Sequence, residues 1–226
     1  MKLFWKVLIP LGIVGIVLIR MFVGEICNVP SGSMYPTIII GDRMWIDKTT
    51  YGARLPKRFA DIPLLNIFTW IKPLREADET RDWGNRRAKG KRMPRIGDLA
   101  VFESPDYPFP MLVKRIAEML KTGDTLAING DNFDSMFKIV LEEGKQIFIR
   151  NDTIFIDGQP DSIVVLSQPY YFMLGDNRKN SIDSRFFGYV PFASVVGRVN
   201  RVLFSLNTDR QFIDIVRWDR FFKRIK

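Results

Sequence analysis

The sequence predicts a mainly β protein that is preceded by one N-terminal transmembrane helix. Residues 7–19 form an uncharged apolar run near the N-terminus. After this run, apolar residues recur mostly with the period of two that is typical of strands. The chain has 226 residues, which is enough for one membrane segment and one or two small domains with a real hydrophobic core.

The N-terminal apolar run is short for a membrane span and also fits the core of a signal peptide. Extended to Leu3–Val23, it gives about 21 residues and about 32 Å of helix. Residues 20–27 offer no good small-x-small cleavage site, so we expect residues 1–24 to be a cytoplasmic tip and a retained anchor. Lys2 and Lys6 predict a cytoplasmic N-terminus, with the rest of the chain on the outer side of the membrane.

Eight further segments are rich in β-branched and aromatic residues and end in residues typical of turns, so we expect each to form a strand. Asn151 and Asp152 lie between two of these segments and predict a hairpin turn. The expected strands are residues 43–48, 98–102, 111–117, 125–129, 146–150, 153–157, 170–174 and 194–205.

Histidine is absent from the whole chain, which restricts the chemistry of any nucleophile. Its absence excludes a Ser-His-Asp triad, a Cys-His pair and a histidine-ligated metal. A lysine that burial keeps neutral near pH 7 is then a familiar strong base for a serine hydroxyl. Cys27 is the only cysteine, so no intramolecular disulfide can form. We expect no metal and no cofactor.

Ser33 and Lys114 are the candidate nucleophile and base. Ser33 lies in the run Pro30–Thr37, about ten residues beyond the apolar stretch. Strand alternation would place Leu112, Lys114 and Ile116 on one face, with an ammonium group in an apolar row. Lowering a lysine pKa from about 10.4 to about 7 or 8 requires roughly 3 to 5 kcal/mol, which burial and a nearby cation can supply. A lysine that extends from an edge strand into solvent is the alternative interpretation.

Four stretches of the chain resemble type I signal peptidases, in the order found in that family. They are residues 30–37, 41–52, 95–115 and 175–188, and the last is long and specific. The resemblance implies a signal-peptidase-type β catalytic core with a small inserted β subdomain. It also implies a membrane-bound serine endopeptidase that removes N-terminal signal peptides from exported preproteins.

The resemblance also implies a role for each matching polar residue. Ser33 would attack the scissile carbonyl, and Lys114 would take its proton and later deliver it to the leaving amine. The backbone N–H of Ser33 and the hydroxyl of Ser31 would hold the oxyanion, and Gly32 between them suits a tight backbone. Ser181 would orient the lysine amine. The charges expected to support the lysine are Arg115, Asp176, Asp183 and Arg185.

Shallow apolar pockets for small substrate side chains are a further implication of the resemblance, with the substrate paired as an extended strand. Cys27 would lie near the outer pocket. Ordinary core packing is an equally good role for each residue at a matching position. These residues are Val29, Met34, Ile38, Leu112 and Val113.

The chain departs from the family pattern in two places. After the lysine strand only Gly123-Asp124 of the usual turn is kept, so Lys121 remains a second candidate for the base. Residues 54–93 also interrupt the pattern as an insertion. Its apolar part, residues 62–71, is too short to span a bilayer, and we expect it to face the membrane or to form a lid on the substrate side. A packed satellite of the core is the alternative.

The net charge of +9 is unevenly distributed, because residues 54–95 hold twelve lysines and arginines against five aspartates and glutamates. The chain has no nucleic-acid-binding motif, so anionic lipid headgroups are the simpler partner. The expected domains are the anchor, a catalytic β core at 25–130 and 169–208, a small β subdomain at 131–168, and a basic amphipathic C-terminal segment at 209–226 that forms a short helix.

Two other functions remain open from the sequence. A self-cleaving Ser/Lys peptidase of the repressor type would need a DNA-binding domain where this chain has an apolar anchor. A catalytically inactive, membrane-tethered module that binds peptides is the other, and the joint presence of Ser31, Ser33, Lys114 and Ser181 argues against it. We therefore expect a monomeric, single-pass protein of the plasma (inner) membrane of a bacterium. Its partners would be signal-peptide-bearing preproteins and the lipid bilayer, and not nucleic acid.

Overall fold

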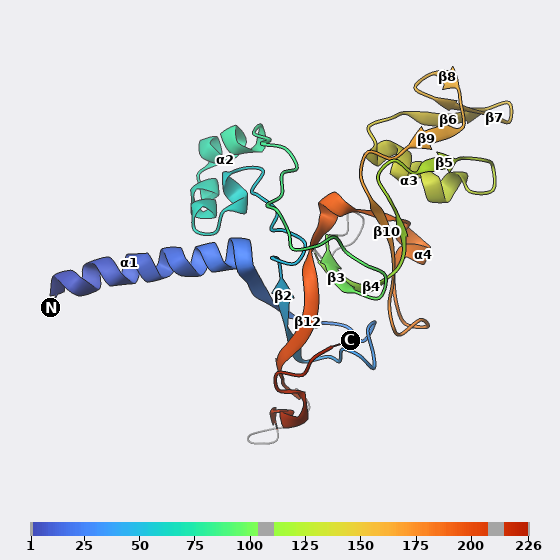
Figure 1. Cartoon of the computed structure of the whole chain (residues 1–226). Coiled ribbons are helices and arrows are strands. Elements are labelled where there is room, and N and C mark those ends of the chain that lie inside the picture. The colour runs from blue at the N-terminus through green and yellow to red at the C-terminus, as the bar shows by residue number, and fades with distance from the viewer. Residues whose placement is uncertain (1, 104–110, 208–214, 226) are drawn as a thin grey trace. The chain divides into compact units, whose positions relative to one another are not determined.

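A computed structural model describes residues 2–103, 111–207 and 215–225, with only the backbone described for residues 2–5. The chain forms two compact units: unit 1 is residues 1–29, 41–94 and 196–225, and unit 2 is residues 30–40, 95–195 and 226. Antiparallel strands form the sheets of the fold, and one apolar helix lies at the N-terminus (Figure 1). The predicted mainly β fold class is therefore confirmed.

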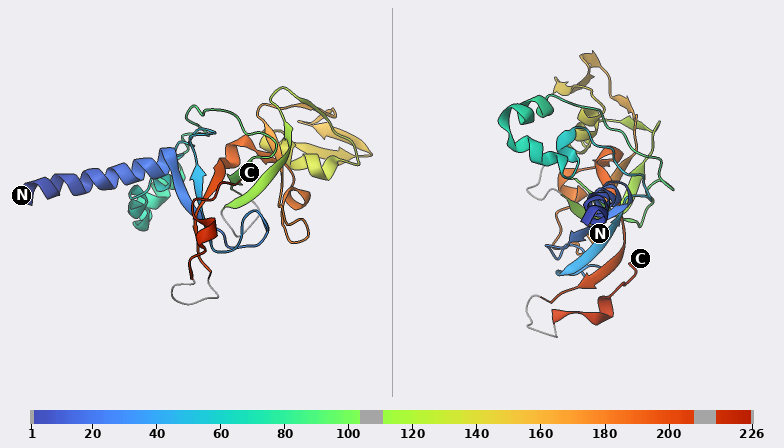
Figure 2. Two further views of the ribbon diagram at one scale, coloured as in Figure 1. Left: turned by 60° about the horizontal axis from the view of Figure 1, so that its bottom comes forward. Right: turned by 90° about the vertical axis from the view of Figure 1, so that its left-hand side faces the viewer.

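Unit 1 begins with one long helix. α1 (Lys2–Leu18) continues without a break into the π-helical turn η1 (Ile19–Val23), and together they form a single rod (Figure 2). The window Lys6–Val23 has a mean hydropathy of 2.2, and none of it is buried within the protein. By length and composition this helix can cross a membrane, as the sequence predicted.

The strands of unit 1 follow the helix directly. β1 (Gly24–Asn28) starts at the residue after η1 and pairs antiparallel with β2 (Asp42–Asp47). β12 (Val195–Ser205) also pairs antiparallel with β2, with two register shifts. Every second residue of β2 is buried, which is the pattern of a strand with one face on a core.

The insertion after β2 is folded on itself. The buried carboxylate of Asp78 accepts hydrogen bonds from the backbone amides of Phe59 and Ala60 at 3.0 and 2.9 Å. The rings of Phe59 and Trp83 meet edge to face, with their centroids 5.0 Å apart. The first part of the insertion is thereby joined to its last part. Its helical elements are η2 (Phe59–Asp61), η3 (Leu65–Trp70) and α2 (Lys72–Glu79).

Residues 215–225 run back along β12, to which they are joined by backbone hydrogen bonds and isolated bridges. The buried Arg220 donates two hydrogen bonds to the carboxylate of Asp42, at the start of β2. Helical structure in this described stretch is limited to Ile215 and the 3-10 turn η6 (Trp218–Arg220). The expected short amphipathic helix is wrong for these residues, because pairing with β12 satisfies their backbone groups instead. Phe212, an expected member of that helix, lies outside the described residues.

Unit 2 is built around the strand that carries the candidate base. β4 (Leu112–Leu120) pairs antiparallel with β3 (Leu99–Phe102) and with β10 (Tyr170–Leu174). β10 pairs in turn with the short strand β11 (Val190–Pro191). All four residues of β3 are buried, which places β4 beside the core of this unit.

The predicted small β subdomain contains small sheets and, in addition, a helix that we did not predict, α3 (Phe133–Glu142). Val140 of α3 is buried in a cluster with Ile128, Ile147 and Val164. Asn151 and Asp152 have φ of 48° and 57° at the predicted hairpin turn, as a type I′ turn requires. The strands are β5 (Thr125–Ala127) with β9 (Ile163–Val165), and β6 (Ile147–Arg150) with β7 (Thr153–Ile156) and β8 (Gln159–Pro160).

Candidate active site

The candidate nucleophile lies in a loop of unit 2 whose neighbours are fixed in the core. Met34 and Ile38 are buried, and the amide of Ile38 donates to the carbonyl of Met34 at 3.0 Å. The amide of Tyr35 donates to the carbonyl of Gly32 at 3.1 Å. Ser33 lies within the turn from Gly32 to Tyr35, directly before Met34, and is half-buried. The loop is therefore held by its apolar residues, while the serine stays partly accessible.

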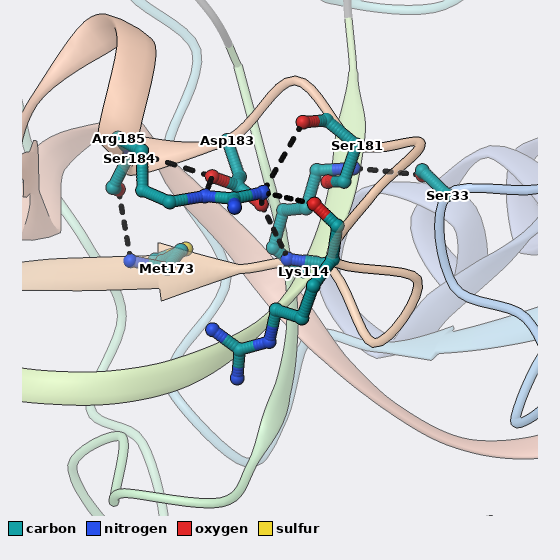
Figure 3. A network of polar contacts seen from close by, with 9 residues as sticks. Ser33, Lys114, Met173, Ser181, Asp183, Ser184 and Arg185 are labelled. Carbon is teal, nitrogen blue, oxygen red and sulfur yellow. Dashed lines mark hydrogen bonds and ion pairs between the residues drawn. The ribbon is translucent and has the colours of Figure 1, made fainter.

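Lys114 and Ser33 are joined directly. Lys114 Nζ donates to Ser33 Oγ at 2.7 Å (Figure 3). Lys114 is only 2% exposed and lies on the same face of β4 as the buried Ile116, as the strand pattern predicted. The alternative of a lysine that extends into solvent is therefore wrong. The hydrogen bond joins two residues that are 81 positions apart in the chain.

Burial lowers the pKa of Lys114 to about 8, although the carboxylates of Asp183 and Asp176 act in the opposite direction and favour the charged amine. Desolvation wins because the ammonium group loses its water when the side chain is enclosed. Near pH 8 about half of the lysine is neutral, and its lone pair can then accept the hydroxyl proton of Ser33. A histidine is not needed for this step.

Asp183 is fully buried close to the lysine strand. Its carboxylate accepts hydrogen bonds from the backbone amide of Gly175 at 2.9 Å and from Arg185 Nε and Nη2 at 2.8 and 3.0 Å. Burial alone would raise the pKa of Asp183, but these hydrogen bonds outweigh it, and the pKa lies below its usual value. Asp183 also caps the short helix α4 (Ser184–Phe187). The predicted support residues Asp183 and Arg185 are thus paired with each other.

Asp176 forms a second charged pair. Arg115 Nε and Nη2 each donate to its carboxylate at 2.8 Å, in a bidentate arrangement. The hydroxyl of Thr37 donates to the same carboxylate at 2.6 Å. Burial would raise the pKa of Asp176, but the bonds from Arg115 and Thr37 lower it on balance. This pair connects the loop of the nucleophile, through Thr37, to the lysine strand.

The hydroxyl of Ser181 is buried and meets no described atom in full hydrogen-bond geometry, although it lies close enough to the Asp183 carboxylate to help lower the pKa of that group. Its carbonyl accepts a bond from Arg185 Nη2 at 3.5 Å (Figure 3). Gly175 shows how closely the two loops approach: a Cβ at this position would overlap Ser181 Oγ and lie 2.7 Å from the carbonyl oxygen of Ser33. Glycine is therefore required here, and the expected bond from Ser181 to the lysine amine stays a prediction.

Ser31 lies beside the nucleophile, with its Oγ 3.3 Å from Ser33 Oγ. Its side chain is exposed, so its hydroxyl is free to rotate toward an incoming substrate. Gly32 begins a tight turn, as expected, but the turn does not require glycine at this position. A Cβ at Gly32 would meet nothing within 4 Å, and its φ lies outside the left-handed region.

The residues predicted to bind substrate fall into two groups. Val29, Met34 and Ile38 are buried, which agrees with the alternative role in ordinary packing. Leu112 and Val113 are half-buried on β4, directly before Lys114. Pocket lining remains a prediction for all five.

Lys121, the second candidate for the base, and the cysteine Cys27 are in environments that do not suit the reaction. Lys121 is exposed on the turn after β4, whereas the hydroxyl of Ser33 is bonded to Lys114. Cys27 is half-buried on β1, and burial, helped by the nearby Glu25, raises the pKa of its thiol. A raised pKa disfavours the thiolate, which is the nucleophilic form. Lys114 and Ser33 remain the pair whose surroundings suit the reaction.

Asn177 is a site residue that the sequence analysis did not single out. Its side-chain amide donates to the carbonyl of Gly32 at 3.1 Å, and its backbone N–H donates to the carbonyl of Ser33 at 3.0 Å. Asn177 therefore holds the backbone on both sides of the nucleophile. Asn177 lies in the 175–188 stretch, whose family resemblance is the most specific, and this position could have identified it from the sequence.

A serine hydroxyl bonded to a buried lysine, on an antiparallel β framework and without histidine, is the arrangement of a Ser/Lys serine peptidase. The model of the family "Signal peptidase, peptidase S26" matches residues 1–204. The chain therefore belongs to the signal peptidase family, whose members are serine endopeptidases that remove signal peptides from preproteins.

Relatives from several bacteria agree with this assignment. A signal peptidase I from Pseudomonas aeruginosa is 28% identical, over 84% of this chain and 68% of the relative. A signal peptidase I from Helicobacter pylori J99 is 24% identical, over 95% of this chain and 90% of the relative. A solved signal peptidase I structure from Enterococcus faecalis V583 is 24% identical over 47% of this chain and 97% of that chain, with a TM-score of 0.25.

Proposed function

We propose that this protein removes signal peptides from exported preproteins with Ser33 as the nucleophile and Lys114 as the general base. The hydrogen bond of 2.7 Å between Lys114 Nζ and Ser33 Oγ carries the proposal. The burial that lowers the pKa of Lys114 to about 8 supports it, because the base must be neutral to act.

The reaction follows from these positions. Neutral Lys114 takes the proton of Ser33 Oγ as the oxygen attacks the scissile carbonyl. The Ser33 N–H and the Ser31 hydroxyl donate to the oxyanion of the tetrahedral intermediate. The lysine ammonium then protonates the leaving amine, and an acyl-enzyme remains on Ser33. Lysine next takes a proton from a water molecule that attacks the ester, which releases the signal peptide as an acid and restores the serine.

The surrounding residues act through the lysine and the loop. Ser181 orients the lysine amine. Asp176 with Arg115, and Asp183 with Arg185, hold the strands and loops in position while their charges stay balanced. The substrate pairs as an extended strand, and its small side chains enter shallow pockets lined by Val29, Met34, Ile38, Leu112 and Val113.

The proposed location is the plasma (inner) membrane of a bacterium, with one span, a cytoplasmic N-terminus and the catalytic body on the outer side. The apolar α1 supports the anchor, and Lys2 and Lys6 support the orientation. The protein acts as a monomer on preproteins at the bilayer, without a metal, a cofactor or nucleic acid. The proposed domains are the anchor, a catalytic β core that contains the 54–93 insertion and pairs with residues 215–225, and a small subdomain that includes β5.

The test is cleavage of a secretory preprotein by the purified full chain in lipid nanodiscs. Ser33→Ala and Lys114→Ala should each lower the rate by at least about 10³-fold, because neither group acts without the other. Lys121→Ala is the matched control and should cleave at the normal rate. A Lys114→Ala protein that cleaves normally would refute the assignment of the base. A wild type that cleaves no preprotein but still binds signal peptides would favour the inactive peptide-binding module.

A further inference from the structure

The insertion of unit 1 carries an exposed apolar surface that the catalytic mechanism does not use. η3 is a 3-10 helix, in which side chains three residues apart lie above one another. Leu65 and Phe68 form one apolar row, and Ile67 and Trp70 form a second. The third row, Asn66 and Thr69, is polar, and the apolar Leu64 and Ile71 flank the helix at its two ends. The segment is therefore amphipathic around its axis.

The apolar rows are exposed although the insertion around them is ordered. Trp70 is 82% exposed, and Ile67, Phe68 and Ile71 are each more than half exposed. The same insertion buries Asp78 as a cap for two amides and stacks Arg81 over the ring of Phe59. These internal contacts show that the segment is folded. The exposure of its large side chains is therefore not caused by a lack of structure. A contiguous exposed apolar surface of this kind marks a binding surface.

The membrane anchor limits which partner can cover the exposed apolar surface of η3. The membrane helix ends at Val23 and β1 begins at Gly24, so no linker separates unit 1 from the bilayer. Lys48 holds this junction, because its Nζ donates to the carbonyl of Arg20 at 2.9 Å and pairs with Glu25 at 3.1 Å. The insertion belongs to the same compact unit as the helix. It is therefore tethered within a short distance of lipid at all times.

The charges next to the apolar rows also suit a lipid surface. Lys72 and Arg75 follow η3 on α2 and are exposed, and their distances of 3.9 Å to Glu76 and Glu79 leave them only loosely paired. Residues 54–95 as a whole carry a large excess of positive charge. Apolar side chains flanked by cations are typical of segments that lie in the boundary between headgroups and acyl chains.

We propose that residues 64–75 form a second membrane contact, in which η3 lies in the bilayer interface and its apolar rows enter the acyl boundary. The occupant of the apolar surface is the anionic bilayer that holds α1. The proposal rests on the proposed membrane location, and it assigns a function to the insertion that interrupts the family pattern.

Tryptophan fluorescence of the full chain in nanodiscs of phosphatidylcholine and phosphatidylglycerol tests this contact. The signal of Trp70 is the difference between the wild type and Trp70→Phe. It should be quenched by lipids brominated near the top of the acyl chain and protected from acrylamide in the water. Quenching by acrylamide alone would place Trp70 in water. Quenching by neither reagent would place it against protein, either a substrate or a second copy. Both results would overturn the proposal.

A pair of matched double variants tests what the contact does. Ile67→Ser/Phe68→Ser removes side chains that are 52% and 54% exposed, and Ile163→Ser/Val165→Ser removes side chains that are 50% and 56% exposed in unit 2. The first should lose the lipid quenching of Trp70 and cleave a membrane-inserted preprotein several-fold more slowly, while the control changes neither. Both should cleave a short water-soluble peptide at the normal rate. Loss of peptide cleavage by the wild type would refute the proposed function and not the membrane contact, which the quenching reports independently.

Discussion

The direction of the Ser33 N–H depends on a peptide unit whose other end is held by Asn177. In a trans peptide the carbonyl of Gly32 and the N–H of Ser33 lie in one plane and point in opposite directions. The bond from the Asn177 side chain to the Gly32 carbonyl therefore also aims the N–H that we assign to the oxyanion. Asn177 is a positioning residue in this scheme, because it acts through the backbone of the nucleophile.

Removing this side chain should affect turnover more than binding. Asn177→Ala should lower kcat about tenfold with little change in KM, since one hydrogen bond contributes roughly 1 kcal/mol. Asn177→Asp should be worse, because a carboxylate would face the Gly32 carbonyl. The pH at which activity is half-maximal should stay near that of the wild type, because Lys114 is untouched. Asn180→Ala, an exposed change in the same loop, is the control. An equal loss in both variants would indicate a general disturbance of the loop.

At the residue scale, the predictable part of the site was its chemistry. Without histidine, a serine and a strand lysine were the remaining pair, and the structure bonds them. The contacts of Gly175 and Asn177 were not predictable in this way. They join segments about 145 residues apart, and no local pattern encodes how closely two loops approach.

Among the elements, the strands were more predictable than the helices. The runs of β-branched and aromatic residues predicted β2, β3, β4 and β10 with end points close to those observed, because these residue types favour strands in buried sheets. α3 was missed although Phe133, Met136, Phe137 and Val140 have helical spacing, since short strands flank it on both sides. The C-terminal residues have similar spacing but pair with β12, and such long-range pairing overrides local periodicity.

The C-terminal segment owes its position to a buried charge pair. Arg220 and Asp42 are both almost fully buried and bonded through two hydrogen bonds. Arg220→Met should destabilise the fold by about 3 to 5 kcal/mol, because it leaves the Asp42 carboxylate buried without its cation. The amides of residues 215–225 should also exchange with deuterium much faster. Asp42→Leu/Arg220→Met should recover most of the stability. A single variant as stable as the wild type would show that this pair does not hold the segment.

For the whole molecule, the titration of Lys114 links catalysis to folding. Its pKa is about 8 in the folded protein and 10.5 without the surroundings of the fold. Between these values the unfolded chain binds more protons, so the stability of the folded state rises with pH. Below pH 8 Lys114 is charged in the folded protein. Burial of this charge then lowers the free energy of unfolding by its full amount, of the order of 3 kcal/mol. The base thus weakens the fold in the pH range where it is inactive.

Activity and stability should therefore respond to pH in the same direction. Between pH 6 and 8 the cleavage rate should rise about tenfold per unit and then level off, as the neutral amine becomes dominant. Lys114→Met should be inactive but should unfold at a higher temperature than the wild type at pH 7, with the difference shrinking toward pH 10. Thermal unfolding in detergent measures this. A variant less stable than the wild type at pH 7 would contradict a costly buried charge.

Because β1 follows the membrane helix without a linker, the chain limits the distance of Ser33 from the bilayer. Ser33 lies ten residues beyond Val23, and ten residues of fully extended chain reach at most about 35 Å. Five of the residues between them are already committed to β1. With Ser33 as the proposed nucleophile, a peptide bond held farther from the bilayer than this tether reaches should stay intact, however well its side chains fit. The proposed function thus selects the distance between a substrate's own membrane segment and its cleavage site before any side chain is recognised.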